Sequence, residues 1–330
     1  MKARILPIMI LCIILVTLAK AQNTYVSPDG YPFEVNLKLQ KDTIMLGEPT
    51  YMDFEIKNLS VVDLGVAVGG DYRNEYGRPE SFDVIVVDSQ GVALPKSQLM
   101  TMGGLMGFQK ALIGGSYNIR LYLSHWANVH QVGKYKILVK KELNVRKYGS
   151  DSTSALLAKD VVLINIESSI TVVSTDYEKM GEVLNSLGER LIARDDTAER
   201  LVPFVMDDRI IRYLAEAIKK TPSLIRYLAK FSDDQALNAI VSRISDTDPE
   251  VRRNVSVALS LSVNPTSKNY LLKMRTDKNV GIRMDVVHYL GKTKTAESTR
   301  ILKEMINDED KQWIGSEARR YLKERGEIVE

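Results

Sequence analysis

The sequence has very little cysteine and few large aromatic side chains. Among its 330 residues there is one cysteine, Cys12, together with six phenylalanines and two tryptophans. A single thiol cannot close an intramolecular disulfide or supply a multi-cysteine zinc site. The small number of large rings also leaves few platforms for stacking against bases. These absences exclude a disulfide-stapled scaffold and disfavour a nucleic-acid partner.

Long hydrophobic runs are also lacking. The apolar run at residues 5–18 is shorter than the ~20 residues that a membrane-spanning helix needs. Basic residues precede this run, and the small-x-small sequence Ala19-Lys20-Ala21 follows it, a pattern typical of an export signal that is cleaved after Ala21. Cys12 lies within the run rather than at its end, which disfavours a lipid anchor. We therefore expect residues 1–21 to be a cleaved signal peptide.

Neither charge sign is in excess once the signal is removed. Cleavage would remove three of the 45 basic residues and no acidic residue, leaving 42 basic against 42 acidic side chains. Such a chain has no overall electrostatic attraction to phosphate. Because Cys12 would be lost as well, the mature protein would have no thiol. We expect an exported protein, periplasmic or extracellular, with no nucleic-acid partner and no membrane span.

The segment at 22–175 has the hydrophobic period of β-strands. Apolar and polar residues alternate at 33–39, 52–58, 119–123 and 135–139, and further apolar runs occur at 161–166 and 170–173. Turn-forming residues separate these runs. About seven short strands, each with one polar face, predict an antiparallel β-sandwich.

Three features of this segment resemble the immunoglobulin-like domains of exported bacterial proteins. These are the Gly-Glu-Pro turn at 47–49, the strand that closes at Asn58, and the Gly133-x-Tyr135 sequence. The last is similar to a tyrosine corner, in which the ring packs inside and the hydroxyl bonds to upstream backbone. The resemblance implies an immunoglobulin-like sandwich without the disulfide of antibody domains.

The segment at 176–330 has a helical period and contains a repeat. Asp246 and the pair Val251-Arg252 are followed 31 residues later by Asp277 and Ile282-Arg283, and Asp308 follows after a further 31. A helix pair repeated at fixed spacing is typical of a solenoid, since one pair cannot bury its apolar face alone.

These residues resemble HEAT repeats of the short type, although Gly315 stands where a third arginine is expected. The resemblance implies an armadillo-like α-α superhelix. The predicted fold class is therefore multidomain, all-β plus all-α. A signal peptide at 1–21 is followed by an immunoglobulin-like sandwich at 22–175 and a HEAT-like helical domain at 176–330.

The repeated aspartates and arginines have two interpretations. Asp246, Arg252, Asp277 and Arg283 could form a ladder that binds anions, or each arginine could pair with aspartates of its own and neighbouring repeats. The resemblance to HEAT repeats favours the structural ladder.

Residues 251–300 hold ten basic and three acidic side chains. If these basic residues shared one face, they would bind an acidic protein segment or an anionic glycan. A solvated helical surface explains the same count without a ligand. The candidate binding residues on the solenoid surface are Arg253, Lys273, Arg275, Lys278, His288 and Arg319.

Metal chemistry has weak support. Met100, Met102 and Met106 are closely spaced thioethers that could bind Cu(I), but methionines in a glycine-rich loop also serve as apolar filler. His125 and His130 lack a visible third ligand for zinc. We predict no cofactor and no other metal.

No catalytic constellation is recognisable. Hydrolase, zinc-protease and phosphate-loop motifs are absent from the sequence. The acidic pairs at 195–196, 207–208 and 233–234 fall where helices begin, so we interpret them as helix N-caps.

The leading hypothesis is a non-catalytic exported scaffold that binds a protein partner through the solenoid, with the sandwich as a spacer or second contact. One alternative is an envelope protein that binds a small ligand, a glycan or Cu(I). Another is an unrecognised enzyme, because short HEAT-like repeats are similar to those of bilin lyases.

Overall fold

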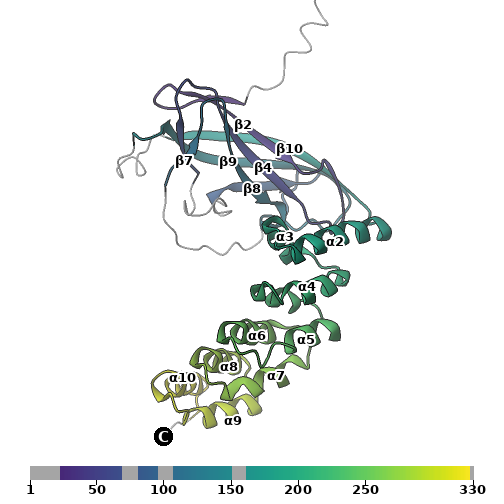
Figure 1. Cartoon of the computed structure of the whole chain (residues 1–330), viewed down its shortest axis with the longest axis vertical. Coiled ribbons are helices and arrows are strands. Elements are labelled where there is room, and N and C mark those ends of the chain that lie inside the picture. The colour runs from purple at the N-terminus through teal and green to yellow at the C-terminus, as the bar shows by residue number, and fades with distance from the viewer. Residues whose placement is uncertain (1–22, 69–80, 96–106, 151–160, 328–330) are drawn as a thin grey trace, which may run out of the picture. The chain divides into compact units, whose positions relative to one another are not determined.

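The computed structural model describes residues 23–68, 81–95, 107–150 and 161–327. The chain divides into two compact units, Met1–Thr175 and Asp176–Glu330, and each is described by itself (Figure 1). We call the first the β unit and the second the helical unit. The predicted signal peptide at 1–21 and the candidate Cu(I) ligands Met100, Met102 and Met106 lie outside the described residues.

The described part of the β unit consists mainly of strands and includes a turn of 3-10 helix, η2 (Leu123–His125). Its described strands are β1 (Thr24–Val26), β2 (Pro32–Leu39), β3 (Thr43–Met45), β4 (Tyr51–Asn58), β5 (Leu64–Ala67), β6 (Asp83–Val87), β7 (Gln109–Ala111), β8 (Ser116–Tyr122), β9 (Gly133–Lys147) and β10 (Val162–Val173).

These strands form two sheets. The four-stranded sheet has the order β1-β2-β4-β8, and the six-stranded sheet has the order β3-β10-β9-β5-β7, with β6 also paired to β9. Neighbouring strands are antiparallel except for β3 and β10, which run parallel with Ile44 opposite Val172. Strand β9 is the longest of these and pairs with β10, β6 and β5 along its length.

One hydrophobic core contains side chains from both sheets. Along β4 the apolar residues Met52, Phe54 and Ile56 are fully buried, while the polar residues between them are not, as the alternating sequence predicts. The Phe54 ring meets Phe82 edge to face at 5.2 Å between centroids. Burying a side chain of this size stabilises a fold by roughly 1.5–3 kcal/mol, so the shared core holds the two sheets together.

The backbone tie predicted for Tyr135 is present. Its ring is buried in the core, and its hydroxyl donates a hydrogen bond of 2.9 Å to the carbonyl of Gln131. The bond fixes the turn that leads into β9.

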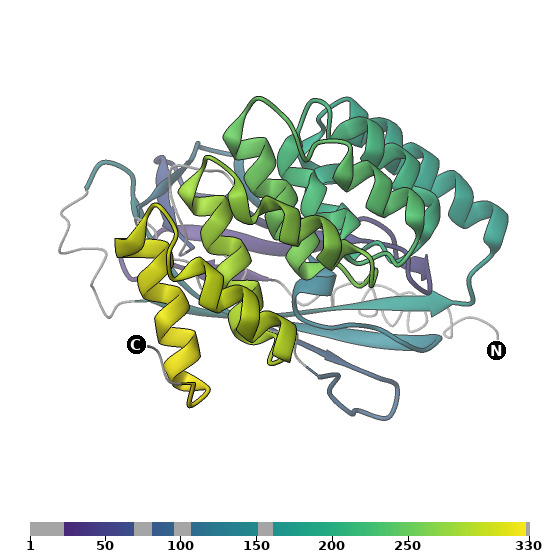
Figure 2. The ribbon, with the colours of Figure 1, turned by 90° about the horizontal axis from the view of Figure 1, so that it is seen from below.

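The helical unit is built from short helices, several of which begin or end in a 3-10 turn, and the last helix follows a turn of π-helix, η8 (Lys311–Gly315). Figure 2 shows them following one another in chain order, from teal to yellow. They are α2 (Tyr177–Ile192), α3 (Asp196–Leu201), η4 (Val202–Phe204), η5 (Asp208–Ile210), α4 (Ile211–Ala217), η6 (Pro222–Leu228), α5 (Asp234–Val241), α6 (Pro249–Leu261), α7 (Ser267–Lys273), η7 (Met274–Thr276), α8 (Val280–Lys292), α9 (Ala296–Met305), η8 (Lys311–Gly315) and α10 (Ser316–Glu324).

In the last part of this unit, α6, α8 and α10 form one layer and α5, α7 and α9 the other (Figure 1). Among the described residues, no helix combines the length and the apolar content needed to cross a bilayer.

Aspartate side chains start several of these helices. Asp195, Asp207 and Asp233 each accept a hydrogen bond from a backbone amide in the first turn of α3, η5 and α5. This confirms that the acidic pairs mark helix starts, with the first aspartate of each pair as the cap and the second in the first turn. Such a cap stabilises a helix by about 1 kcal/mol and satisfies an amide that the helix itself leaves unpaired.

The predicted fold class is wrong. The prediction was an antiparallel immunoglobulin-like sandwich followed by a HEAT-like superhelix, that is, all-β plus all-α. The chain has mixed α/β content, 42% helical and 26% strand, with sheets of four and six strands. The six-stranded sheet includes the parallel pair β3–β10. Alternation in a sequence identifies a strand but not its partner, so this pairing could not be predicted.

Candidate functional site

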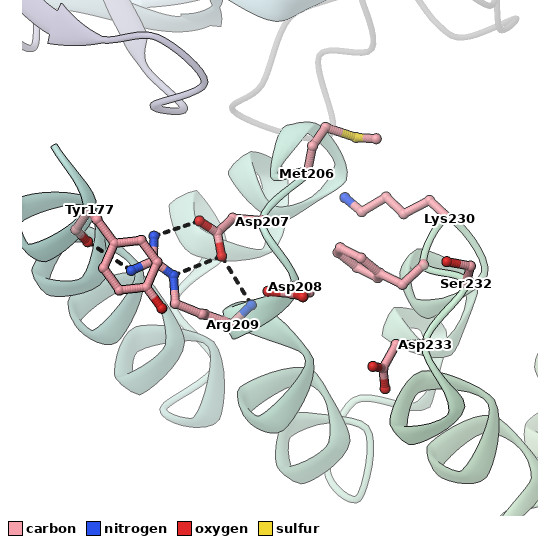
Figure 3. Close-up of a pocket in the computed structure, with 9 residues that line it drawn as sticks. Tyr177, Met206, Asp207, Asp208, Arg209, Lys230, Ser232 and Asp233 are labelled. Carbon is pink, nitrogen blue, oxygen red and sulfur yellow. Dashed lines mark hydrogen bonds and ion pairs between the residues drawn. The ribbon is translucent and has the colours of Figure 1, made fainter. Parts of the chain in front are cut away.

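A polar pocket of about 490 Å³ lies in the helical unit. Three chain segments line it: Tyr177 at the start of α2, residues 206–209 around the start of η5, and residues 230–233 between η6 and α5 (Figure 3). The lining mixes aspartate, arginine, lysine and serine with two aromatic rings and a methionine. The lining of the pocket therefore combines charged groups with apolar surface.

The pocket lies where the repeat of the helical unit is interrupted. Asp176, Asp207, Asp246, Asp277 and Asp308 each accept a hydrogen bond from the amide two residues later. Successive members are 31, 39, 31 and 31 residues apart. The longer interval holds four helical segments, η5, α4, η6 and α5, and the connection between the last two supplies residues 230–233. The insertion thus builds one side of the pocket.

Arg209 organises one side of the pocket. Its Nε and Nη2 atoms donate to the two carboxylate oxygens of Asp207 at 2.9 and 2.6 Å, and Nη1 donates to the carbonyl of Tyr177 at 2.7 Å. The guanidinium also lies 4.0 Å from the centre of the Tyr177 ring. These hydrogen bonds hold the pKa of Asp207 below its ordinary value. Asp207 and Arg209 therefore balance each other's charge and fix the Tyr177 ring.

Lys230 occupies the opposite side. Its amine donates to the carbonyls of Val202 and Pro203 at 2.8 and 3.0 Å and lies 5.2 Å from the Phe231 ring centre. Burial lowers the pKa of Lys230 to about 8, because the charged amine is removed from water. The two carbonyl contacts hold the amine against the η4 turn. Lys230 therefore acts mainly by joining the end of η6 to η4.

The remaining charged groups make the pocket rim acidic. Asp208 and Asp233 are exposed, and Asp233 also caps α5 by accepting from the amide of Gln235 at 2.6 Å. Beside them are the Tyr177 and Met206 side chains, which are 73% and 70% exposed. Carboxylates next to exposed apolar side chains suit a cation on an apolar stem, such as a lysine or arginine side chain.

The arginines of the predicted ladder pair with the next repeat. Arg252 donates to both carboxylate oxygens of Asp277 at 2.8 and 2.9 Å, and Arg283 donates to those of Asp308 at 3.1 and 3.0 Å. Each arginine also donates to a backbone carbonyl six residues before it. The carboxylate of Asp246 pairs instead with Arg243, at 2.7 Å. These arginines tie neighbouring repeats together.

The six predicted binding residues belong to different elements of the helical unit. His288 lies 3.1 Å from the Tyr321 hydroxyl and 3.4 Å from Glu317, and Arg275 donates to the carbonyl of Leu272. The exposed side chains come from separate places along the unit: Arg253 in α6, Lys273 in α7, Lys278 before α8 and Arg319 in α10.

No cluster of three or more histidine, cysteine, aspartate or glutamate side chains suited to a metal occurs in the part of the chain that the structure describes. His125 packs against Trp126 and Tyr122, with ring centres 5.9 and 5.8 Å away. It is therefore part of the packing of η2 itself.

Sequence reasoning missed the pocket as a site. It placed Asp207, Asp208 and Asp233 at helix starts but gave no role to Tyr177, Arg209 or Lys230. The available signal was the spacing of the aspartates, since the 39-residue interval marks an insertion in an otherwise regular repeat.

Comparison with known proteins gives no family. No family model matches the chain, and no curated protein matches it. An engineered protein is 18% identical over 46% of this chain and 74% of its own, with a TM-score of 0.24. A β-glucosidase from Erythrobacter marinus is 16% identical over 45% of this chain and 18% of its own, with a TM-score of 0.21.

The sporulation control protein Spo0M from Bacillus subtilis is 13% identical over 50% of this chain and 56% of its own, with a TM-score of 0.21. Likeness at this level carries no argument about fold or function. The resemblances to immunoglobulin-like domains and HEAT repeats receive no support from these comparisons.

Proposed function

We propose that the chain is an exported, non-catalytic binding protein, and that the pocket of the helical unit takes a basic side chain of a protein partner. The observation that carries this proposal is the acidic rim formed by Asp208 and Asp233 beside the exposed Tyr177 and Met206 side chains. The proposed export rests on the sequence of residues 1–21.

Binding rather than catalysis is supported by how the charged groups of the pocket are engaged. Asp207 is held by Arg209, Lys230 by two carbonyls, and Asp233 by the amide that it caps. A general base needs a nucleophile or a substrate proton within hydrogen-bond reach, and these contacts are structural. Asp208 and Asp233 are exposed, and Asp233 uses only its Oδ1 atom in the cap, so the rim still offers carboxylate oxygens to a cation from outside.

A second candidate is a small organic cation. The pocket volume of about 490 Å³ lies within the range of roughly 300–1,000 Å³ that small-molecule sites occupy. Such a ligand would use the same rim, so the two candidates share the test below and differ in whether the captured ligand is a protein.

The test compares two double variants of the full mature chain as affinity baits. Asp208→Asn/Asp233→Asn removes the negative charge from the rim, while asparagine keeps the helix caps. Glu250→Gln/Glu297→Gln is the control, because it removes the same charge from the first turns of α6 and α9. Circular dichroism should show that both variants remain folded.

We expect one basic partner from an envelope extract to be retained by the wild type and the control, and to bind the rim variant about tenfold more weakly, as the loss of desolvated charge contacts implies. Added salt should weaken retention by the wild type. Equal retention of every captured partner by the rim variant and the control would show that the proposal is wrong.

A further inference from the structure

One end of the β unit exposes a group of apolar side chains on three neighbouring connections. The connection from β4 to β5 carries Leu59 and Val61, the β7–β8 turn carries Leu112 and Ile113, and Tyr148 follows β9. Val61, Leu112 and Ile113 are 87%, 58% and 60% exposed. We call these five residues the apolar end.

Hydrogen bonds hold the three connections together. Asn58, fully buried at the end of β4, donates to the carbonyls of Val62 and Ala111 at 2.8 and 3.0 Å. The carboxylate of Asp63 accepts from the amide of Ile113 at 3.1 Å, and its carbonyl accepts from the amide of Tyr148 at 2.9 Å. The apolar side chains are therefore presented by a fixed framework.

Basic side chains lie next to the apolar end. Lys110 pairs with Asp63 at 2.8 Å and lies 5.2 Å from the centre of the Tyr148 ring. Lys147 is exposed opposite Leu64, and Lys57 precedes Asn58 on β4. Aliphatic side chains beside a tyrosine and lysines form the composition that suits the boundary between lipid headgroups and acyl chains.

We propose that the apolar end docks on the surface of an anionic lipid bilayer, with the aliphatic side chains entering the acyl boundary and the lysines contacting headgroups. The amides of Ile113 and Tyr148 and the carbonyls of Val62 and Ala111 are already used within the framework. The apolar end can therefore recognise a partner mainly through its apolar side chains and its positive charge. The apolar side chains suit the acyl region of a bilayer, and the positive charge suits anionic headgroups. Lys57 and Lys147 supply the charge complementarity, since the charge of Lys110 is balanced by Asp63. The docking is peripheral and needs no membrane-spanning segment.

The test uses the full mature chain and vesicles of phosphatidylcholine with or without phosphatidylglycerol. Leu112→Asp/Ile113→Asp places two charges on the apolar end. The control is Val92→Asp/Val132→Asp, whose side chains are 57% and 56% exposed. Val132 precedes β9, at the opposite end of that strand from Tyr148, and Val92 follows β6, whose last residue Val87 pairs with Lys136 near the start of β9. Both variants therefore convert equally exposed aliphatic residues of the β unit.

We expect the wild type and the control to sediment with phosphatidylglycerol vesicles and the apolar-end variant to partition about tenfold less, since each buried methylene strengthens lipid binding. Pure phosphatidylcholine should bind the wild type more weakly, and salt should reduce binding to the anionic vesicles. Separately, Ile113→Trp should shift its emission to the blue on anionic vesicles, while Val92→Trp should not.

Two results would overturn the proposal. One is a wild-type chain that stays in the supernatant with anionic vesicles at low salt, which would assign the apolar end to a protein partner instead. The other is equal sedimentation of the apolar-end variant and the control, which would place any lipid contact elsewhere on the chain.

Discussion

Among the residues that the structure describes, Lys141 in the β unit is buried and Lys230 in the helical unit is half-buried. Lys141 on β9 donates to the carbonyl of Ser81 at 2.5 Å and lies 5.0 Å from the centre of the Phe82 ring. Burial lowers the pKa of Lys141 to about 8, as it does for Lys230. A carbonyl and a ring face partly replace water around the cation, but they do not restore full hydration.

We expect Lys141→Met to reduce the pH dependence of β-unit stability. Between about pH 8 and pH 10.5 the unfolded chain binds a proton that folded Lys141 has lost, so wild-type stability rises with pH in this window, by about 3 kcal/mol in all. Methionine does not titrate, so the variant should lack this rise and gain stability at neutral pH. The measurement is urea unfolding followed by the fluorescence of buried Trp126, with Trp313→Phe in the background.

The control for this prediction is Lys140→Met, one residue earlier on the same strand. Lys140 is exposed, so its removal should leave the wild-type rise with pH in place. A Lys141→Met chain whose stability still rises as steeply as that of the wild type between pH 8 and pH 10 would contradict burial as the cause of the lowered pKa.

At the scale of elements, arginine–aspartate pairs connect successive helix pairs. The Arg283 side chain is 5% exposed and bonds both oxygens of Asp308. Arg252 makes the same contact with Asp277, and its hydrogen bonds hold the pKa of that carboxyl below its ordinary value. Each pair also joins a turn carbonyl of its own repeat, so one guanidinium crosslinks two turns.

We expect Arg283→Lys to destabilise the helical unit by about 3 kcal/mol, because an ammonium cannot donate two parallel hydrogen bonds and leaves Asp308 buried without a full partner. The double variant Arg283→Met/Asp308→Asn should recover part of this loss, since neither side chain is then a buried, unpaired charge. The measurement is urea unfolding followed by far-ultraviolet circular dichroism.

Arg320→Lys is the matched control for the ladder. Arg320 also contacts two carboxylates, those of Glu317 and Glu324, but it is exposed on α10. Exposed pairs contribute about 0–1 kcal/mol, so this substitution should be nearly neutral. If Arg283→Lys were as mild as Arg320→Lys, the ladder would not be a source of stability.

Local features of the elements were predictable from the sequence, but their pairing was not. Alternation located the strands that became β2, β4 and β9, and capping chemistry placed Asp195, Asp207 and Asp233 at helix starts. These features depend on neighbouring residues. The parallel pairing of β3 with β10 joins segments more than a hundred residues apart, and no local pattern specifies such a partner.

At the scale of the whole molecule, the numbers of basic and acidic residues are nearly equal, 45 and 42, but two local surfaces carry charge of opposite sign. The rim of the pocket is acidic at Asp208 and Asp233, and lysines flank the apolar end of the β unit. The sequence drew attention instead to the basic stretch 251–300, which runs from α6 into α9. The pocket was hidden because its three lining segments are brought together only by tertiary structure.

The even balance itself depends on removal of residues 1–21, which we expect signal peptidase to accomplish after Ala21. The mature chain would begin at Gln22, carry no thiol, and lose the formal charge of +3 of the full chain. Mass spectrometry of protein exported by a bacterial host measures the new N-terminus, and maleimide labelling measures the thiol.

Substitutions of Ala21 test whether signal peptidase cuts the chain after this residue. Signal peptidase accepts small side chains before the cut, so Ala21→Ser should be processed as the wild type is, whereas Ala21→Leu should accumulate as a precursor that retains Cys12 and labels with maleimide. The precursor should also be the more basic species in isoelectric focusing, because Lys2, Arg4 and Lys20 remain. An exported wild-type chain that still begins at Met1 and reacts with maleimide would show that the segment is retained, and the mature protein would then be a basic, thiol-containing one.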